Sequence, residues 1–299
     1  MDEKFKIGPP KKARTPKPMP NEHKQRALFI GLGGSGVKTV LKTRQRLLAR
    51  TEGADEPARK KAFRDLYRFI LIDTDKLSRS MDDAGLPRED EEELRGDHVD
   101  LGPVVPIQVY NAARSAEART PKQKRLLEYV GTTLTRDLRL NSLRDGAGAY
   151  RVNSRIGLAE TYDQAASAIQ SAIEALTSEG NTVGIKPGTA LNVWVVSSLA
   201  GGTGSGILLD VLYLTDRILR SKGQAAPKIR AVLFTPGSFT SFHTPEVIMS
   251  NGYSAMQEIS YFLNNRSANH FRLVSAVPDR ADWEGTAFAS WPVYEAAIP

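Results

Sequence analysis

Two glycine-rich segments of the sequence carry the groups best suited to holding an anion. Residues 31–36 read Gly-Leu-Gly-Gly-Ser-Gly, and residues 201–206 read Gly-Gly-Thr-Gly-Ser-Gly. Glycine lets the backbone turn sharply and come close to a ligand, and free amides at the start of a helix favour negative charge. The hydroxyls of Ser35, Thr203 and Ser205 add donors suited to phosphate oxygens. The two segments therefore predict a phosphate-binding crevice.

Each glycine segment is predicted to join a strand to a helix. Apolar runs predict strands, and apolar residues that recur every three or four positions predict helices. The predicted strands are 26–30, 67–72, 104–109, 191–196, 229–234 and a last one that begins at 291–294. The predicted helices are 37–48, 158–176, 207–219 and one with Met249, Met256, Ile259 and Leu263 on one side. This alternation predicts an α/β fold, a doubly wound and mostly parallel sheet with helices on both faces.

The first glycine segment also fits two other nucleotide-binding patterns, and each fails at a named residue. The dinucleotide fingerprint G-x-G-x-x-G requires an acidic residue about 20 positions later to hold a ribose. The first acid at a predicted strand end is Asp73, well beyond that position, and this pattern leaves residues 201–206 unexplained. A Walker loop requires lysine directly after its last glycine, whereas Val37 follows Gly36. An NAD-binding oxidoreductase therefore remains as a less favoured alternative.

The second glycine segment belongs to a longer pattern. Residues 197–206, Ser-Ser-Leu-Ala-Gly-Gly-Thr-Gly-Ser-Gly, resemble the tubulin/FtsZ signature G-G-G-T-G-[ST]-G, with Ala200 in place of its first glycine. Residues 31–36 resemble the first phosphate loop of that family, and residues 72–75 are similar to the Asn-Thr-Asp that ends the second strand of FtsZ. Residues 144–149 resemble the Gly-Ala-Gly loop that faces the γ-phosphate.

The resemblance covers residues 26–299 and extends to a divergent group of large bacterial tubulin-like proteins, whose Asn-x-Tyr-x-Ala helix is similar to residues 251–255. It implies a GTP- or GDP-binding protein that uses Mg²⁺ and self-associates head to tail into filaments, with hydrolysis completed by a neighbouring subunit. The residues implied to hold the phosphates are Gly33, Gly34, Ser35, Gly36, Gly202, Thr203, Gly204, Ser205 and Gly206.

Four further positions receive roles from the same resemblance. Ala147 and Gly148 are implied to meet the γ-phosphate, and Asp75 to contact the metal-bound water or phosphate shell. Glu246 takes the place of the ribose-binding glutamate, although Ser250 replaces the arginine that FtsZ has four residues later. The resemblance assigns no catalytic residue and no direct metal ligand within the chain.

The same comparison predicts the domain organisation. Residues 25–299 are expected to form one nucleotide-binding domain with a surface insertion at about 80–143, because the stretch between Asp75 and Gly146 is about twice as long as in FtsZ. The chain ends at Pro299, before the family's central helix and catalytic loop. We therefore expect this chain alone to have negligible GTPase activity, and a nucleotide-gated scaffold without turnover is the alternative function.

Composition excludes several other classes of protein. The 299 residues carry a net charge of +7, of which residues 1–24 supply +4 together with five prolines, so this stretch is predicted to be a disordered basic tail. The tail is expected to be solubilising, available to an acidic partner or a membrane surface, without specific nucleic-acid binding. The absence of cysteine excludes disulfides and thiol chemistry. Without a membrane-length apolar run or a signal peptide, a cytoplasmic protein is expected.

Overall fold

The computed structural model describes residues 25–130, 135–178, 191–223, 228–239 and 245–264. Its sheet contains five strands in the order β3-β2-β1-β4-β5, and every neighbouring pair is parallel. The strands are β1 (Ala27–Leu32), β2 (Tyr67–Asp73), β3 (His98–Asp100), β4 (Asn192–Ser198) and β5 (Lys228–Phe234). The predicted α/β fold with a parallel sheet is confirmed.

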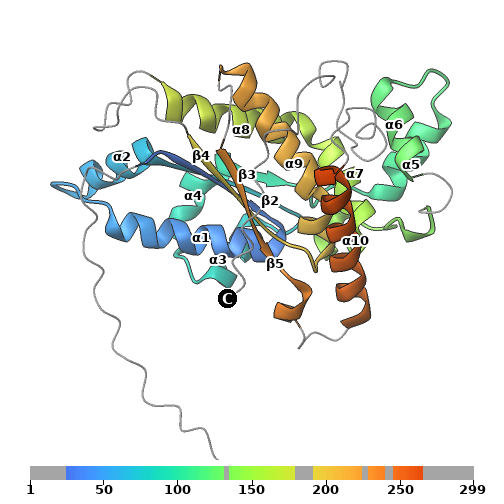
Figure 1. Ribbon diagram of the computed structural model, residues 1–299, viewed down its shortest axis with the longest axis horizontal. Helices are drawn as coiled ribbons and strands as arrows, with labels where there is room; N and C mark the ends of the chain where they lie inside the picture. The colour runs from blue at the N-terminus through green and yellow to red at the C-terminus, as the bar shows by residue number, and fades with distance from the viewer. Residues whose placement is uncertain (1–24, 131–134, 179–190, 224–227, 240–244, 265–299) are drawn as a thin grey trace, which may run out of the picture.

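Helices cover both faces of this sheet (Figure 1). They are α1 (Gly33–Arg50), α2 (Glu56–Leu66), α3 (Leu77–Ala84), α4 (Glu91–Leu94), α5 (Pro106–Ser115), α6 (Pro121–Val130), α7 (Arg151–Glu160), α8 (Tyr162–Thr177), α9 (Gly202–Ser221) and α10 (Pro245–Asn264). In Figure 1, α1 and α3 lie below the sheet, and α8 and α9 lie above it. A parallel sheet with helices on both faces is the doubly wound arrangement. It accounts for strands that are apolar along their whole length, since both faces of these strands are buried.

Two apolar cores follow from these layers. The larger one joins β1 and β4 to α8 and α9 through residues such as Ile30, Val195 and Val211, each fully buried. The smaller one joins α1 and α3 to the other face through Val40, Leu71 and other buried side chains. Both cores therefore hold β1 and β4 in the centre of the sheet, where the two glycine segments begin.

Two local predictions were wrong. The predicted strand at 104–109 is instead the start of α5, because Pro106 at the first helical position favours a helix. The apolar stripe at 158–176 is divided between α7 and α8, with Thr161 between them. The helix predicted around Met249, Met256 and Ile259 is present as α10; Ile259 is buried in it, whereas Met249 and Met256 are more than half exposed. The strand predicted at 291–294 and the tail 1–24 lie outside the described residues.

The acidic residues 89–93 connect helices of the domain through ion pairs. Arg44 of α1 is only 2% exposed and forms ion pairs with Asp90 and Glu93 at 3.3 and 3.1 Å. Arg64 of α2 also pairs with Glu93, at 3.2 Å. The cluster therefore ties α4 and the turn before it to α1 and α2. None of the described helices is long and apolar enough to cross a bilayer.

Candidate functional site

The two glycine segments meet at the carboxyl edge of the sheet. β1 and β4 are neighbours in parallel register, with Leu32 opposite Ser197, so α1 and α9 begin side by side. Gly33 has a φ of +67°, a conformation that favours glycine, and a Cβ built on it would lie 2.8 Å from the Gly204 backbone nitrogen. The backbones of the two segments are therefore in direct contact.

Both helices begin without a side-chain cap. The residues preceding α1 and α9 are Leu32 and Gly201, neither of which makes a side-chain cap hydrogen bond. Neither helix has an acidic residue in its first turn. The first amides of a helix have no partner within it, and the helix dipole adds partial positive charge there. Two such ends side by side favour an anion.

The glycines of these segments divide into two groups by what surrounds them. A Cβ on Gly36 would lie 2.2 Å from the Val196 carbonyl oxygen, and one on Gly204 would lie 2.7 Å from the Leu32 carbonyl oxygen. Gly36 and Gly204 therefore allow helices to pack closely on strands. By contrast, a Cβ on Gly34 would meet only the Asp73 Oδ2 atom at 3.8 Å, and one on exposed Gly201 would meet nothing within 4 Å. Gly34 and Gly201 thus have open space beside them.

The loop at 146–149 lies against the second glycine segment. A Cβ on Gly202 would lie 3.1 Å from the Ala147 Cβ atom, so the loop and α9 touch. Gly146, Gly148 and Ala149 all have positive φ angles, of 82°, 66° and 61°. For alanine this conformation is strained, and such strain persists only where the surroundings hold it. The three segments that sequence reasoning placed around a phosphate are thus brought together.

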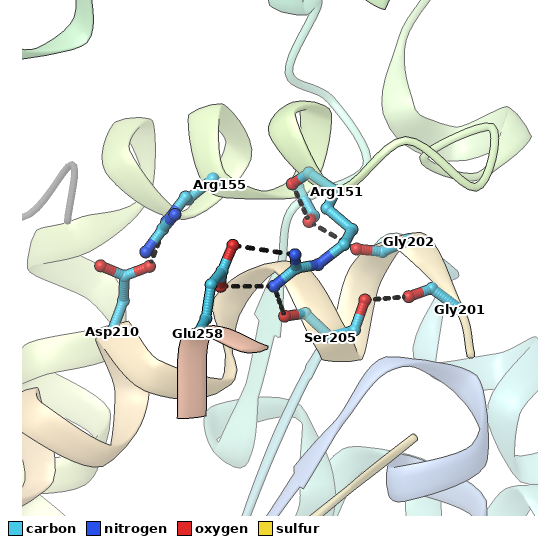
Figure 2. Close-up of polar contacts among 8 residues, drawn as sticks. Arg151, Arg155, Gly201, Gly202, Ser205, Asp210 and Glu258 are labelled. Carbon is cyan, nitrogen blue, oxygen red and sulfur yellow. Dashed lines mark hydrogen bonds and ion pairs between the residues drawn. The ribbon is translucent and has the colours of Figure 1, made fainter. Parts of the chain in front are cut away.

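Side chains of α10 and α7 hold these loops in place, as Figure 2 shows for Arg151. The Asn251 side chain donates to the carbonyl oxygens of Ala149 and Ala200, at 2.7 and 3.0 Å. The Arg151 guanidinium donates to both carboxylate oxygens of Glu258, at 2.9 and 2.6 Å, and to the Ser205 carbonyl oxygen at 3.0 Å. Glu258 and Arg151 were not predicted, because their pairing spans 107 residues of sequence.

The predicted hydroxyl donors differ in their surroundings. The Ser205 hydroxyl donates to the Gly201 carbonyl oxygen within its own helical turn (Figure 2), so its proton is already engaged within α9. Thr203 is 9% exposed in the same turn, and Ser35 is half-buried in the first turn of α1. Glu246 is exposed in the first turn of α10, and no hydrogen bond or ion pair joins it to the glycine segments within the described chain.

The carboxylate nearest to Gly34 belongs to Asp73, not to the predicted Asp75. Asp73 ends β2 and is 2% exposed; its Oδ1 atom accepts a hydrogen bond from the Thr74 amide at 2.7 Å. Its Oδ2 atom has no partner in the described part of the chain. Burial, with a smaller effect of the Asp75 charge, raises the pKa of Asp73 to about 7. The carboxylate of Asp75 pairs with Arg79 at 3.3 Å.

Asp73 should make the ligand-free protein less stable at high pH. Because its folded pKa of about 7 lies above the ordinary 3.8, its contribution to stability falls as pH rises from about 4 to 7 and is lowest above 7. Asp73→Asn keeps an oxygen for the Thr74 amide and removes the charge. We expect a gain of about 2–4 kcal/mol in the free energy of unfolding at pH 8, and less than half of that gain at pH 5. Urea unfolding at both pH values measures this, and an equal effect at the two would contradict it.

Asp73 is also the residue that best fits an implied Mg²⁺. Its unpartnered, buried oxygen lies beside the start of α1, and carboxylate oxygens are ligands that Mg²⁺ accepts while it keeps several waters. Among the described residues, no group of three or more His, Cys, Asp or Glu side chains is arranged to hold a metal ion. A cation shared with phosphate oxygens suits the Asp73 carboxylate.

These features define a class, a doubly wound α/β protein in which two glycine loops meet at the carboxyl edge of a parallel sheet. A family model described as "Tubulin like" matches residues 28–285, and the chain belongs to this tubulin-like family. The predicted resemblance is confirmed. No curated protein matches the chain.

One solved structure with some similarity is a GTPγS-form protofilament of TubZ from Bacillus thuringiensis serovar israelensis. Its sequence is 17% identical, its TM-score is 0.37, and the match covers 81% of this chain and 43% of that chain. The present chain thus spans less than half of the TubZ chain.

Proposed function

We propose that the crevice between the first turns of α1 and α9 binds the phosphates of GTP or GDP. The observation that carries this proposal is the contact of two uncapped helix ends, Gly33 against Gly204, at one edge of the sheet. Membership of the tubulin-like family supports guanine nucleotides as the ligand. The proposed phosphate-binding residues are Gly33, Gly34, Ser35, Gly36, Gly202, Thr203, Gly204, Ser205 and Gly206.

The neighbouring residues are proposed to serve the terminal phosphate and the cation. Ala147 and Gly148 lie on the loop that touches Gly202, and we place them beside the γ-phosphate. Asp73 and Asp75 would hold Mg²⁺ or its waters. When bound, Mg²⁺ neutralises phosphate charge. Asp73 lies at the buried end of β2, and its Oδ2 atom has no partner within the described chain. This oxygen is therefore available to a cation.

Assembly into filaments is the second part of the proposal. α10 presents an exposed apolar stripe of Met249, Tyr253 and Met256, with 57%, 66% and 51% of each residue exposed. The same helix holds the loops through Asn251 and Glu258, so a nucleotide at those loops would influence the stripe. We propose that the stripe contributes to contacts between copies of the chain.

A nucleotide-gated scaffold without turnover is the second candidate, and one observation favours it. The carboxylates around the loops are largely occupied: Glu258 pairs with Arg151, Asp100 with Arg144 at 2.5 Å, and Asp210 with Arg155 at 2.7 Å. A carboxylate held in an ion pair is poorly placed to activate water. Phosphate release that rises faster than linearly with protein concentration would support hydrolysis across subunits, and its absence would favour the scaffold.

A charge placed at Gly201 tests the nucleotide site. Gly201→Asp adds a carboxylate at the N-cap of α9, where it can bond the free amides, so we expect unchanged or higher stability. It should weaken GTP binding by more than about 100-fold, because it occupies the amides and repels phosphate. Isothermal titration calorimetry with GTP, GDP, ATP and NAD measures the affinities.

Gly96→Asp is the matched control, because a Cβ there also meets nothing within 4 Å and Gly96 lies before β3, away from both loops. It should leave GTP binding unchanged. Tight NAD binding without GTP binding by the wild-type chain would overturn the proposed function. GTP binding that survives Gly201→Asp would place the ligand elsewhere.

A further inference from the structure

Arg139 lies next to the loop 146–149, and its backbone is fixed there by a buried side chain. The Asn153 Oδ1 atom accepts a hydrogen bond from the Arg139 amide at 3.0 Å. The Asn153 Nδ2 group donates to the carbonyl oxygens of Asp137 and Ala147, at 3.1 and 3.0 Å. Asn153 is fully buried, so it holds the Arg139 segment and the loop in one fixed relation.

The Arg139 side chain extends along the loop itself. A Cβ built on Gly148 would lie 2.8 Å from the Arg139 Nη1 atom and 3.2 Å from its Cδ atom. Gly148 has a φ of +66°, a conformation that favours glycine, and the Arg139 guanidinium lies in the space that a side chain at this position would occupy. The guanidinium is therefore placed directly against the loop that touches the start of α9.

The guanidinium of Arg139 is unpaired, unlike its neighbours. Within the described part of the chain, no hydrogen bond or ion pair engages its side chain, which is half-buried. The three arginines that follow it are all paired: Arg144 with Asp100, Arg151 with Glu258 and Arg155 with Asp210. An arginine kept free beside a strained glycine loop has a charge available for a ligand.

We infer that Arg139 binds the terminal phosphate of a nucleoside triphosphate and makes the site discriminate triphosphate from diphosphate. The planar guanidinium matches phosphate oxygens with two parallel hydrogen bonds. The loop that it covers contacts Gly202, at the start of the helix whose amides are proposed to hold the phosphates. This assignment rests on the proposed nucleotide function and adds a specificity-determining residue to it.

The test compares Arg139→Ala with Arg136→Ala. Arg136 belongs to the same short segment, is 83% exposed at its side chain and makes only a 3.9 Å pair with Asp137, so it is a matched control. Calorimetry with Mg²⁺ should show that Arg139→Ala weakens GTPγS binding about tenfold or more and changes GDP binding by less than about twofold. Arg139→Lys, which keeps the charge and loses the fork, should fall between wild type and alanine. Arg136→Ala should change neither affinity.

Three results would overturn the inference. They are GTPγS binding unaffected by Arg139→Ala, an equal loss of GTPγS and GDP binding, and a lowered melting temperature that accounts for the loss. A wild-type chain that binds neither nucleotide would instead refute the proposed function, and the role of Arg139 with it. Normal wild-type binding with unchanged variants would refute the role of Arg139 alone.

Discussion

Gly36→Ala is expected to destabilise the protein severely. The added Cβ would lie 2.2 Å from the Val196 carbonyl oxygen, a backbone atom of the central strand β4 that cannot move aside without breaking its ladder. α1 would have to shift away from the sheet, so we expect the free energy of unfolding to fall by more than about 3 kcal/mol. Urea unfolding followed by circular dichroism measures the loss. Nucleotide binding should be lost with it, because the start of α1 is displaced.

Gly34→Ala is the matched control, two residues earlier in the same helical turn. Its Cβ would meet only the Asp73 Oδ2 atom, at 3.8 Å, and alanine favours a helix over glycine by about 1 kcal/mol. We expect equal or greater stability but weaker nucleotide binding, because the methyl group enters the proposed crevice. If the two variants behaved alike in stability, the packing of α1 on β4 would not be as close as described.

Arg155→Met is the second change with a large expected effect. The Arg155 and Asp210 side chains are 3% and 1% exposed and form an ion pair at 2.7 Å between α7 and α9 (Figure 2). Removal of the arginine leaves a buried carboxylate without this partner, which typically costs about 3–5 kcal/mol. Thermal unfolding should show a correspondingly lowered melting temperature.

The double variant Arg155→Met/Asp210→Leu separates the charge from the packing. With both charges replaced by apolar side chains of similar volume, most of the lost stability should return. If the double variant were as unstable as Arg155→Met, the loss would come from the shape of the arginine and not from an unpaired charge. Either result bears on Asp210, because a carboxylate this deeply buried and paired is not available to a bound nucleotide.

The glycine segments themselves were predictable from the sequence. Their types and spacing, and the apolar runs before them, depend on residues a few positions apart, so both strand–glycine–helix units could be identified. The resemblance of residues 197–206 to one family was equally local, and the family match over residues 28–285 confirms it. Local patterns were misleading where a short apolar run has no period, as at 104–109, and where one apolar stripe continues across two helices, as at 158–176.

The contacts within the site depend on residues far apart in the chain. Asp73 lies beside Gly34 because β2 pairs with β1. The ion pair of Glu258 with Arg151 joins α10 to α7. No spacing in the sequence distinguishes Asp73 from Asp75, because only packing decides which carboxylate is buried and unpartnered. Likewise, only the structure shows that Arg144, Arg151 and Arg155 each pair with an acid, whereas the Arg139 guanidinium has no such partner in the described chain.

The sequence alone thus determined the class of fold, the two glycine loops and the family. The tertiary structure decided which glycines pack against backbone and which have open space beside them. The physical reason is the range of the interactions: helix and strand periods are set by neighbours along the chain. Segments that are distant in the sequence meet only after β1, β2 and β4 have formed one sheet. These segments decide which atoms surround a glycine, whether a carboxylate is buried and which acid pairs with an arginine.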